Sequence, residues 1–192
     1  LVYCEDVRYI DFGHNEYLDS CDFVSGMTNL EYIILSGAPI KDLSPFENCK
    51  KLRILEIAFC HYIEDISPLA ACESLEMLNI GFTQVKDLSA LDNLNLTNLC
   101  IDGAKVKAEE RERFASLKSD CWITYDDAQP YNDGWRYTEE NKPLPWYGMI
   151  RSVFRYDRDP NIPNNVGWYL PEDFEDVLAN TPMPIEEEVT EE

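Results

Sequence analysis

The residues of this chain that could do chemistry are few and scattered. Only two histidines occur, His14 and His61, and the second directly follows Cys60. Neighbouring residues of a strand point to opposite faces, so Cys60 and His61 are poorly placed to act as a nucleophile and its base. The sequence also lacks a glycine-rich phosphate loop, a Gly-x-Ser-x-Gly elbow and a His-Glu-x-x-His motif. We therefore expect no enzymatic activity and no cofactor.

Metal binding is not expected either. Asp157-x-Asp159-x-Asn161 imitates the start of a calcium loop, but Ile162 stands where the loop needs glycine and Trp168 where it needs glutamate. Two histidines and dispersed cysteines do not form a zinc set.

The elements that position the remaining side chains form a repeat of 22 or 23 residues. Its three clearest copies are Leu30-x-x-Ile33-x-Leu35, Leu52-x-x-Leu55-x-Ile57 and Leu75-x-x-Leu78-x-Ile80. Weaker copies are Val7-x-x-Ile10-x-Phe12, Leu96-x-x-Leu99-x-Ile101 and the fragment Cys121-x-Ile123. A fixed period of this length predicts a solenoid, in which each repeat needs its neighbours to bury its apolar face.

Each clear copy contains a strand and then a short helical segment. In Ser44-Pro45 and Ser67-Pro68 we predict an N-cap serine followed by proline at the first helical position. Ser44 and Glu47 would complete a capping box.

The repeat resembles that of leucine-rich-repeat proteins, in particular the bacterial 22-residue, internalin-like subclass, over residues 1–125. The resemblance implies an α/β fold of about five repeats, with a curved parallel sheet on the concave side and short helical segments on the convex side. Cys49, Cys60, Cys72 and Cys121 fall at recurring repeat positions, so we interpret them as small buried side chains rather than as a disulfide framework.

The second part of the chain differs in composition. Residues 107–118 predict a helix that, with the strand fragment 121–125, caps the sheet. Residues 126–180 are rich in aromatic residues and proline, and we expect them to pack on the repeats, with helices at 146–156 and 171–178. Residues 181–192 read as a disordered acidic tail.

Asp133-Gly134-Trp135-Arg136, followed by Arg151-x-x-Phe154, resembles a C-terminal extension of secreted leucine-rich-repeat proteins of Firmicutes. The resemblance implies a secreted or cell-envelope protein, and a cytoplasmic location is the alternative. The chain begins at Leu1, which we interpret as the start of a mature or trimmed fragment. No run approaches the ~20 apolar residues of a membrane span.

The formal net charge is -21, from 37 acidic and 16 basic residues. This balance disfavours nucleic acid and anionic membranes as partners; it favours solubility alone as its role, and a basic protein partner is the alternative.

The leading functional prediction concerns the concave face. Residues that flank the inward leucines should point outward and form an aromatic stripe that binds a protein. The predicted binding residues are Tyr9, Tyr32, Ile34, Ile54, Glu56, Phe59, Met77, Asn79, Phe82 and Trp122. One alternative is a scaffolding protein whose C-terminal segment covers this stripe. Another is that these side chains are scattered exposed apolar residues, which are normal on a protein surface. Exposed Tyr and Trp also suit a glycan, which is a more distant alternative.

Overall fold

The computed structural model describes residues 4, 6–125, 135–137 and 142–153. The chain divides into two compact units, Leu1–Pro130 and Tyr131–Glu192, which are described separately. The predicted helix at 171–178 and the acidic tail at 181–192 lie outside the described residues.

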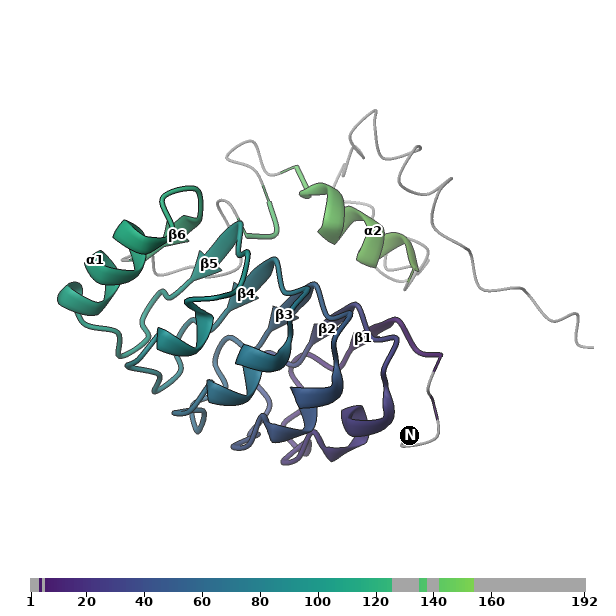
Figure 1. Ribbon diagram of the computed structural model, residues 1–192. Coiled ribbons are helices and arrows are strands. Elements are labelled where there is room, and N and C mark those ends of the chain that lie inside the picture. Colours follow the sequence, from purple (N-terminus) through teal and green to yellow (C-terminus); the bar gives the residue numbers. More distant parts are fainter. Residues whose placement is uncertain (1–3, 5, 126–134, 138–141, 154–192) are drawn as a thin grey trace, which may run out of the picture. The chain divides into compact units, whose positions relative to one another are not determined.

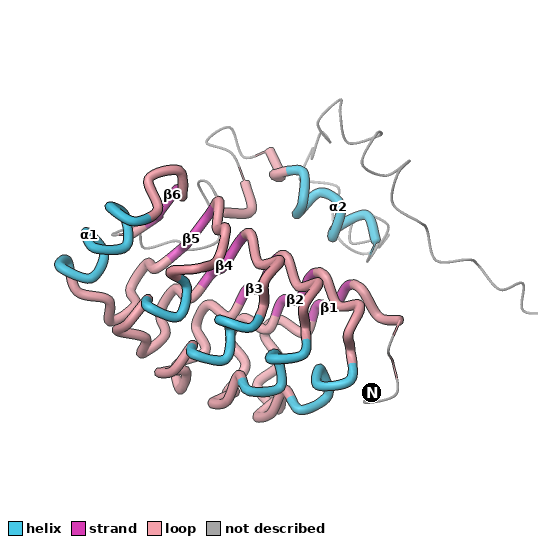
Figure 2. The backbone as a smooth tube through the Cα atoms, in the orientation of Figure 1, coloured by secondary structure: helices cyan, strands magenta, loops and turns pink. Residues whose placement is uncertain are grey.

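The first unit contains one parallel sheet of six three-residue strands in chain order, as the repeat predicts (Figure 1). The strands are β1 (Tyr9–Asp11), β2 (Tyr32–Ile34), β3 (Ile54–Glu56), β4 (Met77–Asn79), β5 (Asn98–Cys100) and β6 (Trp122–Thr124). Four short 3₁₀ helices return the chain from one strand to the next. They are η1 (Asp22–Gly26), η2 (Ser44–Asn48), η3 (Ser67–Ala71) and η4 (Ser89–Leu91), and they lie on the side opposite the sheet (Figure 2).

The core lies between the strands and the 3₁₀ helices. The leucines that open the repeats stack in a row, and all of them are buried: Leu30, Leu52, Leu75 and Leu96. The middle residue of each strand also points into this core, and Phe46 and Leu69 fill it from η2 and η3. No repeat contains this core alone, so burial depends on stacking, as expected for a solenoid.

The cysteines pack as the repeat positions predict. Cys49, Cys60 and Cys72 are buried and reduced, and each thiol donates a hydrogen bond to a backbone carbonyl of the preceding repeat. Burial raises the pKa of Cys60 to about 12 and that of Cys49 to about 11. Cys121 is only partly buried because it lies next to the last strand.

The prediction that serine side chains cap the 3₁₀ helices is wrong. Leu43, not Ser44, is the N-cap of η2, and no side chain caps it; the box with Glu47 does not form. Instead, the Asp42 carboxylate accepts hydrogen bonds from the Ser44 N–H (2.8 Å) and from the Ser44 hydroxyl (2.7 Å). Asp65 binds Ser67 in the same way. The aspartate two residues before each serine therefore accepts a backbone N–H at the start of the helix, and the serine is the first residue of the helix.

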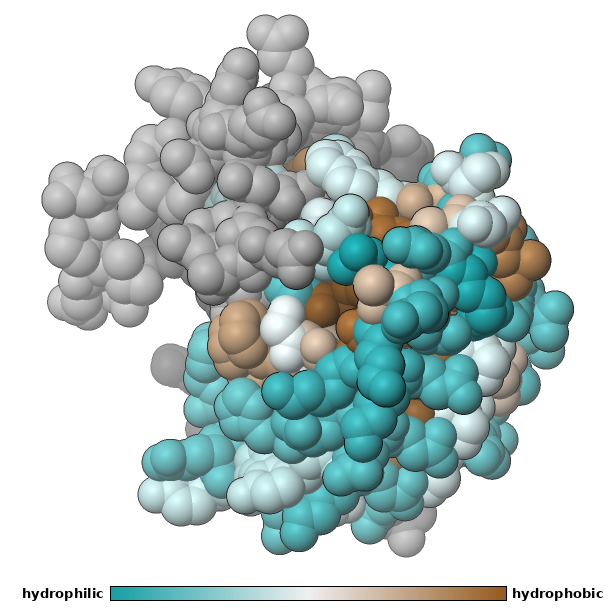
Figure 3. Space-filling view, turned by 90° about the vertical axis from the view of Figure 1, so that its left-hand side faces the viewer, coloured by the Kyte–Doolittle hydropathy of each residue, from teal (hydrophilic) through white to brown (hydrophobic). Residues whose placement is uncertain are grey.

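The helix predicted at 107–118 is confirmed as α1 (Ala108–Leu117), followed by β6 at the edge of the sheet. Arg113 joins α1 to the preceding repeat by a bidentate ion pair with Asp92 (2.9 and 3.0 Å), and within α1 it also pairs with Glu110. Glu110 in turn accepts the backbone N–H of Leu88 at 2.8 Å. The face of the molecule on the α1 side is mostly hydrophilic (Figure 3).

The second unit contains α2 (Pro145–Val153), which confirms the described part of the helix predicted at 146–156. Trp146 donates its indole N–H to the Trp135 carbonyl at 2.8 Å, and the two rings meet edge to face. Whether this unit packs on the repeats stays a prediction. None of the helices in the described ranges is long and apolar enough to cross a membrane.

Candidate binding surface

The strand register brings the predicted binding residues together on one face. The first residues of the six strands are paired directly across the sheet, and we call them the first row: Tyr9, Tyr32, Ile54, Met77, Asn98 and Trp122. The third residues form the second row: Asp11, Ile34, Glu56, Asn79, Cys100 and Thr124. Both rows point away from the core because the middle residues point into it.

One end of the first row is an aromatic stack. The rings of Tyr9 and Tyr32 lie 5.1 Å apart and nearly parallel. The guanidinium of Arg8 lies 5.1 Å from the Tyr9 ring centre, and that of Arg53 lies 5.8 Å from the Tyr32 ring centre. Arg53 also donates a hydrogen bond to the Tyr32 hydroxyl at 3.0 Å. Burial raises the pKa of both tyrosines, so they remain neutral phenols.

A row of alternating charges borders this stack, and we call it the flank row: Arg8, Glu31, Arg53 and Glu76. Each member directly precedes the first residue of a strand. Arg8 pairs with Glu31 at 2.8 Å, and Arg53 pairs with both carboxylate oxygens of Glu76. The sequence prediction missed this row, although the charged residue just before each of the first four strands was visible at the repeat spacing.

The second row is mostly polar, and its side chains are hydrogen-bonded within and between the repeats. The Ser36 hydroxyl donates to Glu56 at 2.7 Å. The backbone N–H of Gly81 donates to the Asn79 side chain at 2.9 Å. These bonds hold the side chains of Glu56 and Asn79 close to the sheet.

Exposure along the predicted stripe is therefore uneven. Trp122 is 59% exposed, and the rest of the predicted set is half-buried or buried. The half-buried residues are Tyr9, Phe59, Met77 and Phe82, and the buried ones are Tyr32, Ile34, Ile54, Glu56 and Asn79. Stacking and hydrogen bonding between neighbouring rungs contribute to this burial, an effect that residue type and spacing alone did not reveal.

The strand ends carry a strained pair of phenylalanines. Phe59 and Phe82 have φ values of 60° and 58°, at the repeat position where Gly37 and Gly103 occur. Their rings are stacked 4.6 Å apart. A bulky residue rarely adopts this left-handed conformation, which costs roughly 1–2 kcal/mol. The Phe82 ring also packs closely on Gly103, where a Cβ would lie 2.7 Å from the ring.

The histidines and cysteines do not assemble into a reactive site. Cys60 is buried and bonded to the Leu35 carbonyl, whereas His61 is exposed, with Nδ1 lying 3.0 Å from the Phe82 carbonyl. Within the described residues, no group of three or more His, Cys, Asp or Glu side chains could hold a metal ion.

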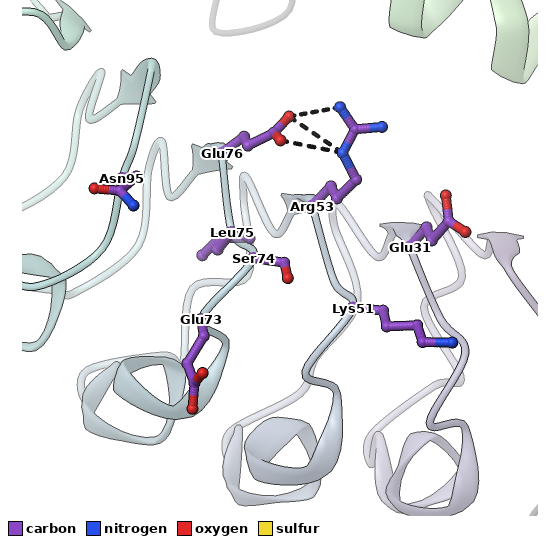
Figure 4. A pocket seen from close by; sticks show the side chains of 8 residues that line it. All are labelled: Glu31, Lys51, Arg53, Glu73, Ser74, Leu75, Glu76 and Asn95. Atoms are coloured by element: carbon purple, nitrogen blue, oxygen red, sulfur yellow. Dashed lines mark hydrogen bonds and ion pairs between the residues drawn. The ribbon is translucent and has the colours of Figure 1, made fainter.

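A groove of about 480 Å³ opens on the flank of the repeats, beside the flank row (Figure 4). We call it the flank groove. It is lined by Glu31, Lys51, Arg53, Glu73, Ser74, Leu75, Glu76 and Asn95. All these residues lie in the loops that lead into β2–β5, and the sequence prediction did not include them.

Comparisons with known proteins agree with this architecture. A family model described as leucine-rich repeats, two copies, matches residues 28–71. The solved structure of internalin C2 from Listeria monocytogenes is 26% identical, with a TM-score of 0.51, over 59% of this chain and 52% of that chain. No curated protein matches the chain.

Two further solved structures share the fold. An internalin of Listeria monocytogenes is 24% identical over 67% of this chain and 46% of its own, with a TM-score of 0.53. A leucine-rich-repeat protein of Leptospira interrogans is 24% identical over 55% of this chain and 28% of its own, with a TM-score of 0.51. The chain thus spans about half the length of the internalins, or less. From its six-rung sheet, the repeat match over residues 28–71 and these structures, the first unit has the leucine-rich-repeat solenoid fold and is similar to the internalins.

Proposed function

We propose that the repeat unit is a non-catalytic protein-binding module that uses the concave face of its sheet, in a bacterial envelope or extracellular setting. The internalin-type repeat supports the general function, and the resemblance of residues 133–154 to secreted proteins supports the setting. The binding residues we propose are those of the sequence prediction, with the half-buried and exposed ones making first contact.

The arrangement of Tyr9 and Tyr32 carries the choice of a protein over a glycan. A sugar stacks on a free ring face, but these two rings face each other and each also has an arginine near its face. The part of the two tyrosines left for a ligand is therefore the edge of a cluster of aromatic rings and arginines. Such clusters are typical of protein-binding hot spots. Trp122, at the other end of the row, offers a large exposed anchor.

The function is tested by comparing the proteins that the full chain captures with those that two variants capture, with identification by mass spectrometry. Replacing Tyr9 and Trp122 by alanine together should remove a specific partner that the unmodified chain retains. Replacing Tyr62, which is 58% exposed and lies outside both rows, is the matched control and should retain that partner. If both variants capture the same proteins as the unmodified chain, the concave face is not the binding surface.

The scaffolding alternative makes a different prediction. If residues 126–180 cover the concave face, a chain that ends at Tyr125 should aggregate or melt at a much lower temperature, because apolar first-row residues become exposed. A truncated chain that stays monomeric and equally stable would contradict the alternative. Glycan-array binding that is lost with Trp122→Ala would favour the glycan instead.

A further inference from the structure

The flank groove arises where one repeat is shorter than its neighbours. In the repeats of β3 and β4, two residues separate the buried cysteine that follows the 3₁₀ helix from the leucine before the strand. They are Lys50 and Lys51 in one, and Glu73 and Ser74 in the next. In the repeat of β5 only Asn95 fills this interval. The missing residue leaves Glu73 and Ser74 uncovered on the β5 side, which hollows the flank (Figure 4).

The cations of the groove are already engaged. Lys51 donates to the Asn29 side chain at 2.7 Å, and Arg53 donates to Glu76 through two of its nitrogens. Arg53 uses a third nitrogen on the Tyr32 hydroxyl. These bonds draw both positive side chains toward the neighbouring repeats and toward the concave rim.

The oxygen acceptors of the opposite wall are not engaged in the same way. The Glu73 side chain is 80% exposed, and its nearest cation, Lys50, lies at 4.0 Å. Among the described residues, the Ser74 hydroxyl and the Asn95 carboxamide form no hydrogen bond with another group. One carboxylate, which has a long 4.0 Å ion pair with Lys50, and two neutral oxygens therefore line one wall.

We propose that the flank groove binds a lysine or arginine side chain of a protein partner. An ammonium carries three donors and a guanidinium five, which suits a wall of three acceptors. The net charge of -21 attracts cationic partners over a distance and disfavours an acidic side chain. The groove adjoins the concave face, because Arg53 and Glu76 directly precede Ile54 and Met77. The choice of a protein as partner rests on the proposed function.

The inference is tested on the full chain by amide NMR, with an acetylated and amidated Gly-Arg-Gly peptide as the probe at physiological salt. The amides of Glu73, Ser74 and Asn95 should shift together and give one affinity, while the matched Gly-Glu-Gly peptide should leave them unchanged. Glu73→Gln should weaken the binding by about threefold to fivefold, the upper range for one exposed charge pair. Glu47→Gln removes the same charge from an exposed position of η2 outside the groove and should change the affinity less than twofold.

Two further variants test the groove itself. Inserting one serine after Asn95 restores the usual repeat length and should abolish the shifts at Ser74. The surface variant Ser74→Ala with Asn95→Ala keeps the chain length and should also weaken binding. If Glu47→Gln weakens the peptide as much as Glu73→Gln does, or if the affinity is unchanged by Glu73→Gln and by the alanine pair, the proposal is overturned.

The outcome can be separated from that of the proposed function. Tyr9→Ala with Trp122→Ala changes the concave face and leaves the groove intact, so peptide titration of that variant should match the unmodified chain. Loss of partner capture with normal titration then concerns the concave face alone. If the variant with Tyr9 and Trp122 replaced still captures the partner and still binds the peptide, the concave face is not the binding surface. The proposed peptide site in the flank groove would then still be supported.

Discussion

The contact between Gly103 and Phe82 makes a quantitative prediction. A Cβ added at Gly103 would lie 2.7 Å from two carbons of the Phe82 ring, and the backbone there has a φ of 62°. Gly103→Ala should therefore cost about 1–2 kcal/mol for the left-handed backbone and about 1–3 kcal/mol for overpacking. The sum is about 2–5 kcal/mol of unfolding free energy.

The two terms can be separated by a matched control and by a double-mutant cycle. Gly37 has a φ of 78°, but its added Cβ would meet its nearest atom, on His14, at 3.5 Å, an ordinary contact. Gly37→Ala should thus show only the backbone cost. In a Phe82→Ala background the overpacking disappears, so Gly103→Ala should cost about as much as Gly37→Ala does.

Urea denaturation followed by circular dichroism measures these free energies, and a change of the slope would reveal loss of two-state behaviour. The reasoning predicts a coupling of about 1–3 kcal/mol between positions 82 and 103. If Gly103→Ala costs the same with and without the Phe82 ring, the ring does not rest on this glycine, and the close packing is refuted.

Three other predictions follow from local chemistry. The buried thiols, whose pKa values are raised to about 11 or 12, should resist a thiol reagent at pH 8 until the protein unfolds; rapid native labelling of them would contradict their burial. They are Cys21, Cys49, Cys60, Cys72 and Cys100. Hydrogen bonds from Ser44 lower the pKa of Asp42, so its contribution to stability is present above the pKa of an unfolded aspartate and is lost as the pH falls through the lower folded pKa. Melting temperatures should accordingly fall in acid, and Asp42→Asn should flatten that dependence; an unaltered profile would count against the bond. Arg113→Met should speed hydrogen exchange in α1 and β6 more than in β3, whereas equal exchange throughout would mean that the ion pair with Asp92 does not hold the cap.

Much of the first unit could be predicted because the repeat is redundant. A strand of three residues is too short to recognise by itself, but the same apolar pattern at a fixed spacing identifies six strands and their order. The row of Tyr9, Tyr32, Ile54 and Met77 follows from this register. The error at Ser44 has a local cause, because the side-chain oxygens of aspartate and serine can both accept a backbone N–H at a helix start, and the sequence does not show which of them does so.

The groove and the strained phenylalanines could not be predicted in the same way. Both depend on departures from the repeat: one residue missing near Asn95, and phenylalanine where neighbouring repeats have Gly37 and Gly103. A departure is visible in the sequence, but its effect depends on which side chains of the adjacent rungs fill the space. Likewise, the charged residues before the strands are visible in the sequence. That Arg53 pairs with Glu76 rather than with Glu31 depends on side-chain geometry, which the sequence does not show.

The sequence by itself determined the solenoid, the strand register and which residues face away from the core, because periodic burial is encoded by residue type at each repeat position. The tertiary structure decided how side chains on that face share contacts: Tyr9 on Tyr32, Glu56 on Ser36, and Phe82 on Gly103. Those contacts join residues about one repeat apart, and their geometry depends on the stacking of neighbouring rungs at van der Waals distance. No single repeat contains that information.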